Sequence, residues 1–203
     1  MCGIAGIMFK SETTGLDTGR ALVEMLDGCQ HRGPDSTGFA LYAPADEGTL
    51  RIRFFVGDGD EAAAAIERIN DVLSDHHAEV VSAETVGINY RVTVEFGGDL
   101  QRFAYAVEHA ARVVSIGTSL DIVKDVGSAH DVNERYDVSS FQGSHGLGHV
   151  RLATESDVKP EASHPFWATG FADVAIVHNG QITNYWKMRR RLQQRGFEFT
   201  TDN

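Results

Sequence analysis

The sequence predicts an α+β fold, in which antiparallel strands alternate with helices that carry one apolar face each. Residues 90–96 alternate strictly between apolar and polar side chains, as in a half-buried strand. Residues 60–75 and 99–112 repeat apolar side chains at helical spacing. Residues 2–9 mix small and apolar residues, as a buried strand does.

The first 43 residues are expected to form a strand, a helix and a second strand. Leu22, Met25 and Leu26 give the helix its apolar face, and Gly28 ends it. A polar turn with glycine and proline then precedes the second strand. The expected elements are a strand at 2–9, a helix at 17–28 and a strand at 37–42.

The next segment has the element order βαββαβ. The expected elements are strands at 51–56, 79–86, 90–96 and 112–124 and helices at 60–75 and 99–112. This order is the ferredoxin-like arrangement. A unit of this kind can fold on its own core, so it can be inserted in a loop of another domain. We therefore predict an inserted subdomain at 50–126, within a host domain formed by 1–49 and 127–203.

The host domain resumes near Tyr136. Strands are expected at 146–153 and 173–178, and a loop with Pro160, Pro165 and Gly170 separates them. A helix is expected at 184–195, ending at Gly196.

Composition excludes several classes of function. The formal net charge of -11 argues against nonspecific binding to nucleic acid or to an anionic membrane. The basic run in 187–195 is at helical spacing and is read as a solvated face. No apolar run approaches the roughly 20 residues of a membrane span.

With only two cysteines, Cys2 and Cys29, and no secretory signal, we expect a reduced, cytoplasmic protein. The nine histidines lack metal-ligand spacing, so no metal site is predicted.

Cys2 directly follows Met1. Removal of Met1 would give Cys2 both a thiol and a free α-amine, whose pKa is about 7.7–8.0. Such an amine can act as the base for its own side-chain nucleophile. The alternative is that Cys2 is a small apolar residue that opens a strand.

Five segments in order link Cys2 to a known family. They are MCGIAG at 1–6, HRGPDS at 31–36, GHVRLAT at 148–154, HNGQITN at 178–184 and TTDN at 200–203. In this order they resemble the class II glutamine amidotransferases, whose glutaminase domains use an N-terminal nucleophile. The resemblance covers 1–43 and about 136–203. It implies the αββα sandwich of N-terminal nucleophile (Ntn) hydrolases, here with the ferredoxin-like unit inserted.

The resemblance implies a role for each matching residue. Cys2 matches the nucleophile that attacks the amide of L-glutamine, and Asn179 and Gly180 match the pair that binds the oxyanion. Each such donor contributes about 3–4 kcal/mol to transition-state binding. The alternative for Asn179-Gly180 is a hairpin turn, and a turn could also aim both donors.

Further matches concern the substrate's free end and a lid. Arg151 matches the residue that holds the α-carboxylate, Asp202 the residue that binds the α-ammonium, and Thr154 an assisting hydrogen-bonding group. The alternatives are a surface arginine and an ordinary strand-edge threonine. His164 falls in a stretch that matches the mobile glutamine loop, so it is assigned to a lid rather than to a general base. The 31–36 turn is expected to brace the nucleophile strand, with Arg32 and Asp35 available to each other.

The chain looks most like the stand-alone glutaminase subunits of archaeal-type glutamate synthase and N-methylglutamate synthase. That likeness places the ammonia-accepting chemistry on partner synthase subunits, together with flavin and iron–sulfur centres. No cofactor is expected on this chain. The sequence stops right after Asp202, so the glutaminase domain is expected to be truncated at its C-terminus, and a retained Met1 would block the amine.

Two other readings stay open at this point. An asparagine synthetase-like glutaminase domain shares the Arg-Gly-Pro-Asp stretch, although the ATP-binding domain of that family is absent here. A non-catalytic regulatory subunit would use the inserted unit as a ligand sensor. The sequence does not identify the acceptor, the partner subunits or the oligomeric state.

Overall fold

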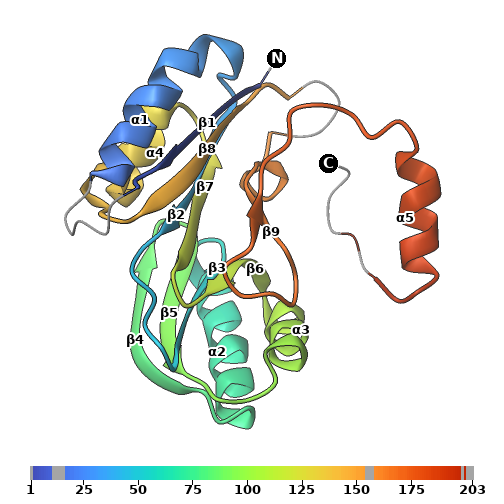
Figure 1. Cartoon of the computed structure of the whole chain (residues 1–203). Helices are drawn as coiled ribbons and strands as arrows, with labels where there is room; N and C mark the ends of the chain where they lie inside the picture. The colour runs from blue at the N-terminus through green and yellow to red at the C-terminus, as the bar shows by residue number, and fades with distance from the viewer. Residues whose placement is uncertain (1, 11–16, 154–157, 198, 200–203) are drawn as a thin grey trace.

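The computed structural model describes residues 2–10, 17–153, 158–197 and 199. It has an α+β fold, as predicted (Figure 1). In chain order the helices and strands are β1 (Gly3–Met8), α1 (Thr18–Cys29), β2 (Ser36–Tyr42), β3 (Thr49–Phe55), α2 (Gly59–Asp75), β4 (Glu79–Val86), β5 (Asn89–Glu95), α3 (Leu100–Ala110), β6 (Arg112–Gly117), β7 (Leu120–Val126), α4 (Ala129–Tyr136), β8 (His145–Arg151), β9 (Phe166–Trp167), β10 (Ala175–Ile176) and α5 (Tyr185–Gln193).

The first sheet has the strand order β1-β8-β2-β7, with antiparallel neighbours throughout. Helices α1 and α4 cover one of its faces (Figure 1). Glycines in β8 allow α1 to approach the sheet closely. A Cβ at Gly146 would lie 2.6 Å from Leu22 Cδ1, and one at Gly148 would lie 2.7 Å from Leu26 Cδ1. The glycines and Val150 thus face α1, and the alternate residues of β8 face the opposite side.

The second sheet has the strand order β4-β5-β3-β6 and is also antiparallel. The element order from β3 to β6 is βαββαβ. Helices α2 and α3 pack on this sheet through a core of large apolar side chains. Its fully buried members include Ile52, Phe54, Ile69, Val92, Val94, Phe103, Val107 and Ile116.

The strand expected at 112–124 is in fact two strands, and this prediction was wrong. β6 ends at Gly117 and pairs with β3, whereas β7 begins at Leu120 and pairs with β2 of the first sheet. The break lies at Thr118 and Ser119, whose backbone N–H groups both donate to the carboxylate of Asp173. A turn held by a distant side chain cannot be read from local periodicity, which continues through 112–124.

Buried contacts join the two sheets. A third apolar cluster combines Ala40 and Ile122 of the first sheet with Phe55 and Val114 of the second. Beside it, Arg53 Nε and Nη2 each donate to Asp121 at 2.7 Å. Burial alone would raise the pKa of Asp121, but the charge and hydrogen bonds of Arg53 outweigh it and hold that pKa below its usual value. The bidentate pair fixes the second sheet to β7.

Helix α4 was not predicted from the sequence. It begins with a capping box, in which Ser128 accepts from the backbone of Asp131 and the Asp131 carboxylate accepts from the backbone of Ser128. The Ser-x-x-Asp spacing was a signal that could have identified this start.

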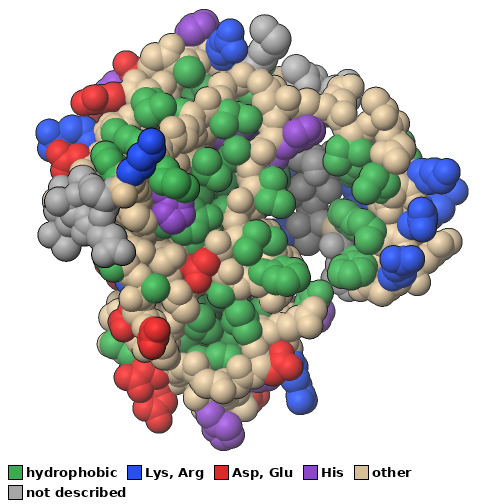
Figure 2. Space-filling model, in the orientation of Figure 1, with side chains coloured by type: hydrophobic (Ala, Val, Ile, Leu, Met, Phe, Trp, Pro, Cys, Tyr) green, Lys and Arg blue, Asp and Glu red, His purple; other side chains and the backbone are tan. Residues whose placement is uncertain are grey.

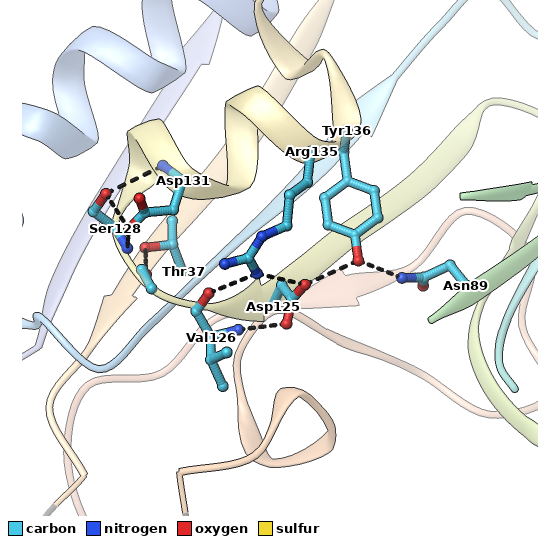
Figure 3. A network of polar contacts seen from close by, with 9 residues as sticks. Thr37, Asn89, Asp125, Val126, Ser128, Asp131, Arg135 and Tyr136 are labelled. Atoms are coloured by element: carbon cyan, nitrogen blue, oxygen red, sulfur yellow. Dashed lines mark hydrogen bonds and ion pairs between the residues drawn. The ribbon is translucent and has the colours of Figure 1, made fainter. Parts of the chain in front are cut away.

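The end of α4 ties both sheets together through Tyr136 (Figure 3). Asn89 of β5 donates to the Tyr136 hydroxyl at 2.9 Å, and this hydroxyl donates to Asp125 of β7 at 3.0 Å. Arg135 donates to the same carboxylate at 2.8 Å. Burial, together with the charge of Asp125, raises the pKa of Tyr136 to about 12, so the hydroxyl stays protonated as a donor.

Residues 158–197 pack less fully on this framework. The strand expected at 173–178 is reduced to Ala175–Ile176, which pairs with β9. Helix α5 stands apart (Figure 1) and has no buried residue within its described range, 185–193. Its exposed basic residues form a patch at that side of the molecule, visible in Figure 2. In the described part of the chain, no helix combines the length and apolar character needed to cross a membrane.

Candidate active site

Cys2 lies at the end of the first sheet where β1 starts and β8 ends. Gly3 pairs with Val150 in the last register position of that ladder, and Arg151 still pairs with Ser36 of β2, so Cys2 and Arg151 lie at the same end of the sheet. The backbone N–H of Leu152 donates to Cys2 Sγ at 3.4 Å. The half-buried thiol is thus held by the residue that follows Arg151.

The 31–36 turn contacts the end of β8, the strand that pairs with β1. Asp35 Oδ2 accepts from the backbone N–H of Ala153 at 2.7 Å, and the Asp35 N–H donates to the Arg151 carbonyl at 3.1 Å. A Cβ at Gly33 would lie 2.5 Å from the Val150 carbonyl oxygen, so only glycine allows this approach. The expected pairing of Arg32 with Asp35 does not occur in the structure, where both residues are described.

Asn179 reaches Cys2 across the chain. Its Nδ2 donates to the Cys2 carbonyl oxygen at 2.9 Å, a contact between residues 177 positions apart. Gly180 follows at an exposed position, where the atoms nearest to a Cβ would be those of the His178 ring, at 3.0 Å. The structure therefore brings together the predicted nucleophile and the predicted oxyanion pair. In this arrangement one N–H of the Asn179 amide is bonded to the Cys2 carbonyl oxygen.

Arg151 is 4% exposed and lies on the face of β8 that also carries His149. His149 was not predicted as a site residue, although its position two residues before Arg151 in a strand places both on one face. The His149 and His164 rings lie 4.9 Å apart. Burial, and the proximity of the two rings, lowers the pKa of His149 to about 4. Burial likewise lowers the pKa of His164 to about 4, so both are neutral near pH 7.

The stretch around His164 is packed on the sheet. Lys124 of β7 donates to the carbonyl oxygens of Ser163 at 2.8 Å and Pro165 at 3.2 Å. A Cβ at Gly38 would lie 2.2 Å from the His164 carbonyl oxygen. Burial lowers the pKa of Lys124 to about 7. These anchors hold residues 163–165 against the sheet, and the lid role of His164 stays a prediction.

Thr154 and Asp202, the other two predicted substrate-binding residues, lie outside the described residues. Within the described part of the chain, no group of three or more His, Cys, Asp or Glu side chains is arranged to hold a metal ion.

The histidine pair predicts an acid-labile fold. The pKa of each histidine is about 4 in the folded state, below the usual 6.5, so the unfolded chain binds more protons between these values. The unfolding free energy should therefore fall as pH drops from about 6.5 to 4, by up to about 1.4 kcal/mol per pH unit for each histidine. Urea unfolding at pH 7, 6 and 5 measures this slope.

The variant His149→Asn should lower that slope by up to about 1.4 kcal/mol per pH unit, which corresponds to one bound proton. The exposed His109 offers a matched control, because His109→Asn should leave the slope as it is in the wild type. An unchanged slope in His149→Asn would show that the buried imidazole does not control acid stability.

Comparison with known proteins agrees with the geometry. A family profile described as "Glutamine amidotransferase domain" matches residues 134–203, which include Arg151, Asn179 and Gly180. A glutamine amidotransferase of Methanothermobacter thermautotrophicus is 36% identical over 213 residues, covering 100% of this chain and 68% of that protein. The chain belongs to the glutamine amidotransferase family.

Other relatives of this glutamine amidotransferase align either with the whole chain or with about half of it. The glutamine amidotransferase-like protein GlxB of Rhizobium meliloti is 35% identical and covers 100% of this chain and 66% of its own length. The chain thus spans about two thirds of the length of these first two relatives. A glutamine–fructose-6-phosphate aminotransferase of Shewanella oneidensis is 31% identical over 104 residues, which cover 51% of this chain and 17% of that enzyme.

Proposed function

We propose that this glutamine amidotransferase hydrolyses L-glutamine through a thioester on Cys2 and passes the ammonia to a synthase on partner subunits. The main support is the 2.9 Å contact from Asn179 Nδ2 to the Cys2 carbonyl. It joins the amide of one motif to the backbone of the cysteine in another, at the end of the first sheet where Arg151 ends β8.

The proposed chemistry begins when Met1 is removed. The free α-amine of Cys2 takes the thiol proton, and Sγ attacks the amide carbon of glutamine. Asn179 Nδ2–H and the Gly180 backbone N–H then hold the developing oxyanion. The C–N bond breaks as the α-amine returns the proton, so ammonia leaves and a glutamyl thioester remains. Water then attacks the thioester, which releases glutamate and restores the thiol.

Recognition of the substrate's zwitterionic end is assigned to three residues in this proposal. Arg151 pairs with the α-carboxylate through its two-pronged guanidinium, and Asp202 pairs with the α-ammonium. Thr154 assists by a hydrogen bond. A site that pairs both charges rejects amides that lack either one, because a buried partner would be left without its counterion.

The ammonia acceptor is proposed to lie on another polypeptide, as in synthases of the glutamate or N-methylglutamate type. Relatives named as fructose-6-phosphate aminotransferases and as amidophosphoribosyltransferases share only about half of this chain. That pattern fits a common glutamine-using half joined to different acceptors. In this proposal the partner subunits carry the flavin and iron–sulfur centres, and the assembly is cytoplasmic.

The host would be an Ntn-type sandwich, with the ferredoxin-like unit as an insertion that contacts the acceptor. The pairing of β7 with β2 supports ending this unit at β6, near Gly117, rather than at 126. A deletion that tests the unit should therefore keep β7.

The test is ammonia release by the purified chain with a defined N-terminus. Mass spectrometry first establishes that Met1 is absent, and ammonia and glutamate are then measured in parallel. We expect equal amounts of both from glutamine, and a higher rate when acceptor subunits are added. In a matched form, a lysine inserted between Met1 and Cys2 keeps the methionine and moves the amine away from the thiol. Equal turnover by that form, or no turnover by the trimmed chain, would contradict the proposal.

A further inference from the structure

Asp173 makes a concentrated set of polar contacts with a single turn. Its carboxylate accepts five hydrogen bonds from three consecutive residues, 118–120. Thr118 donates from its N–H at 3.1 Å and from its hydroxyl at 2.9 Å. Ser119 donates in the same two ways at 2.8 and 3.1 Å, and the Leu120 N–H donates at 2.8 Å. These backbone and hydroxyl donors outweigh the effect of burial and hold the pKa of Asp173 below its usual value.

The fit between Asp173 and this turn is tight on both sides. Asp173 has φ of 61°, in the left-handed region that aspartate tolerates better than most residues. A Cβ at Gly117 would lie 2.3 Å from Asp173 Oδ1, so only glycine can precede the turn at this distance. The backbone N–H of Asp173 also donates to the Ile116 carbonyl at 3.3 Å.

The turn at 118–119 connects the two sheets. β6, before it, pairs with β3 of the second sheet, and β7, after it, pairs with β2 of the first. Asp173 therefore takes its position from both sheets at the point where they meet.

Asp173 also lies only six residues before Asn179. The segment between them contains β10, which pairs with β9, and the Ala168 N–H donates to the Val174 carbonyl at 2.9 Å. Residues 163–176 thus form a folded-back segment with two anchors: Lys124 of β7 binds its start, and Asp173 within it binds the turn at 118–119. Asn179 follows this segment and contacts Cys2. Six residues reach at most about 20 Å, so the place where Asp173 is anchored limits the positions from which Asn179 can reach Cys2.

We infer that Asp173 is a positioning residue for the reaction: by binding the turn between β6 and β7, it sets the approach of Asn179 and Gly180 to Cys2. This inference rests on the proposed oxyanion role of Asn179 and Gly180. Asp173 itself is remote from the thiol and acts through the segment that follows it. It also links the unit from β3 to β6 with the glutamine site, because that unit supplies one side of the turn.

The test compares Asp173→Ala and Asp173→Asn with Asp71→Ala, a change at an exposed carboxylate on α2. All variants are assayed as the trimmed full chain, at a temperature where circular dichroism shows them folded. We expect kcat for glutamine to fall about 100-fold in Asp173→Ala, the usual effect of a misplaced or lost oxyanion donor. KM should stay within about twofold of the wild-type value, because Arg151 lies on β8 and not on this segment. The kcat of Asp173→Asn should lie between those of the wild type and Asp173→Ala. Asp71→Ala should match the wild type.

A second measurement separates positioning from loss of structure. Alkylation of Cys2 by iodoacetamide needs no oxyanion donors, so its rate should be unchanged in Asp173→Ala. Hydrogen exchange of amides 174–180 should be at least about tenfold faster in this variant, because the anchor of the segment is gone. A kcat within twofold of wild type, or equal losses in kcat and alkylation, would overturn the inference.

Failure of the proposed function would look different. In that case the wild type itself releases no ammonia, whatever the variants do, and the exchange of amides 174–180 still decides whether Asp173 holds the segment. Unchanged exchange in Asp173→Ala would overturn the anchoring itself.

Discussion

Replacing Cys2 with alanine is expected to abolish ammonia release from glutamine. Without Sγ no thioester can form, and removal of a catalytic nucleophile lowers turnover by at least about 1,000-fold in enzymes of this kind. The fold should persist, because Cys2 is only half-buried and its side chain contacts the backbone of Leu152. The measurement is ammonia release, combined with the stoichiometry of labelling by an electrophilic glutamine analogue.

Cys29 provides the matched control for this prediction. It is the other cysteine of the sequence and is also half-buried, but it lies at the end of α1, against Gly3. Cys29→Ala should keep wild-type turnover and one equivalent of label. Full labelling of the Cys2→Ala variant would mean that another group is the nucleophile.

Much of the fold could be predicted from the sequence because most elements are defined locally. The helix at 60–75 and the strand at 90–96 follow from apolar periodicity, and the observed elements are Gly59–Asp75 and Asn89–Glu95. Element order from β3 to β6 also follows from this periodicity. What local pattern could not give is the sheet to which a strand belongs, and so β7 was assigned to the wrong neighbours.

The site also contains residues that local sequence could predict and residues that it could not. Cys2, Asn179 and Arg151 were predicted from short motifs, and the structure brings them to one edge of the first sheet. Residues that act by supporting others were missed, because their partners are far away in the chain. Asp173 contacts residues 53 to 55 positions before it, and Lys124 contacts the carbonyl of Ser163 39 positions ahead. One signal was present for Lys124: a charged residue at an inward-facing position of an apolar strand needs a partner.

The face of the first sheet that is turned away from α1 carries two basic side chains, and the imidazoles beside them are neutral. Lys124 and Arg151 are both buried on it, and each lowers the pKa of the neighbouring His164. A protonated His164 would add positive charge beside Arg151, and beside the protonated form of Lys124, where little water can screen it. Neutral imidazoles fill this space without that penalty.

Arg151→Ala is therefore expected to cause a large loss in glutamine binding. A guanidinium pairs with a carboxylate through two parallel hydrogen bonds, and loss of one partner of such a pair costs on the order of 2–4 kcal/mol. This corresponds to a rise in KM of about 30- to 900-fold if binding alone is affected. Because Arg151 is 4% exposed, its removal also leaves a cavity, so Arg151→Lys is needed as a second variant that keeps the charge and most of the volume.

Substrate analogues separate the loss of the proposed clamp, in which Arg151 and Asp202 bind the two charged groups of glutamine, from a general disturbance of the site. Glutamine with its α-carboxylate converted to an amide should be a poor substrate for the wild type, and Arg151→Ala should treat it and glutamine nearly alike. An analogue without the α-amine is the control, because its discrimination depends on Asp202 and should survive in Arg151→Ala. Arg151→Lys should recover only part of the preference, since a single ammonium cannot reproduce the two-pronged contact. A KM within about twofold of wild type, a change of only about 0.4 kcal/mol, would remove Arg151 from the clamp.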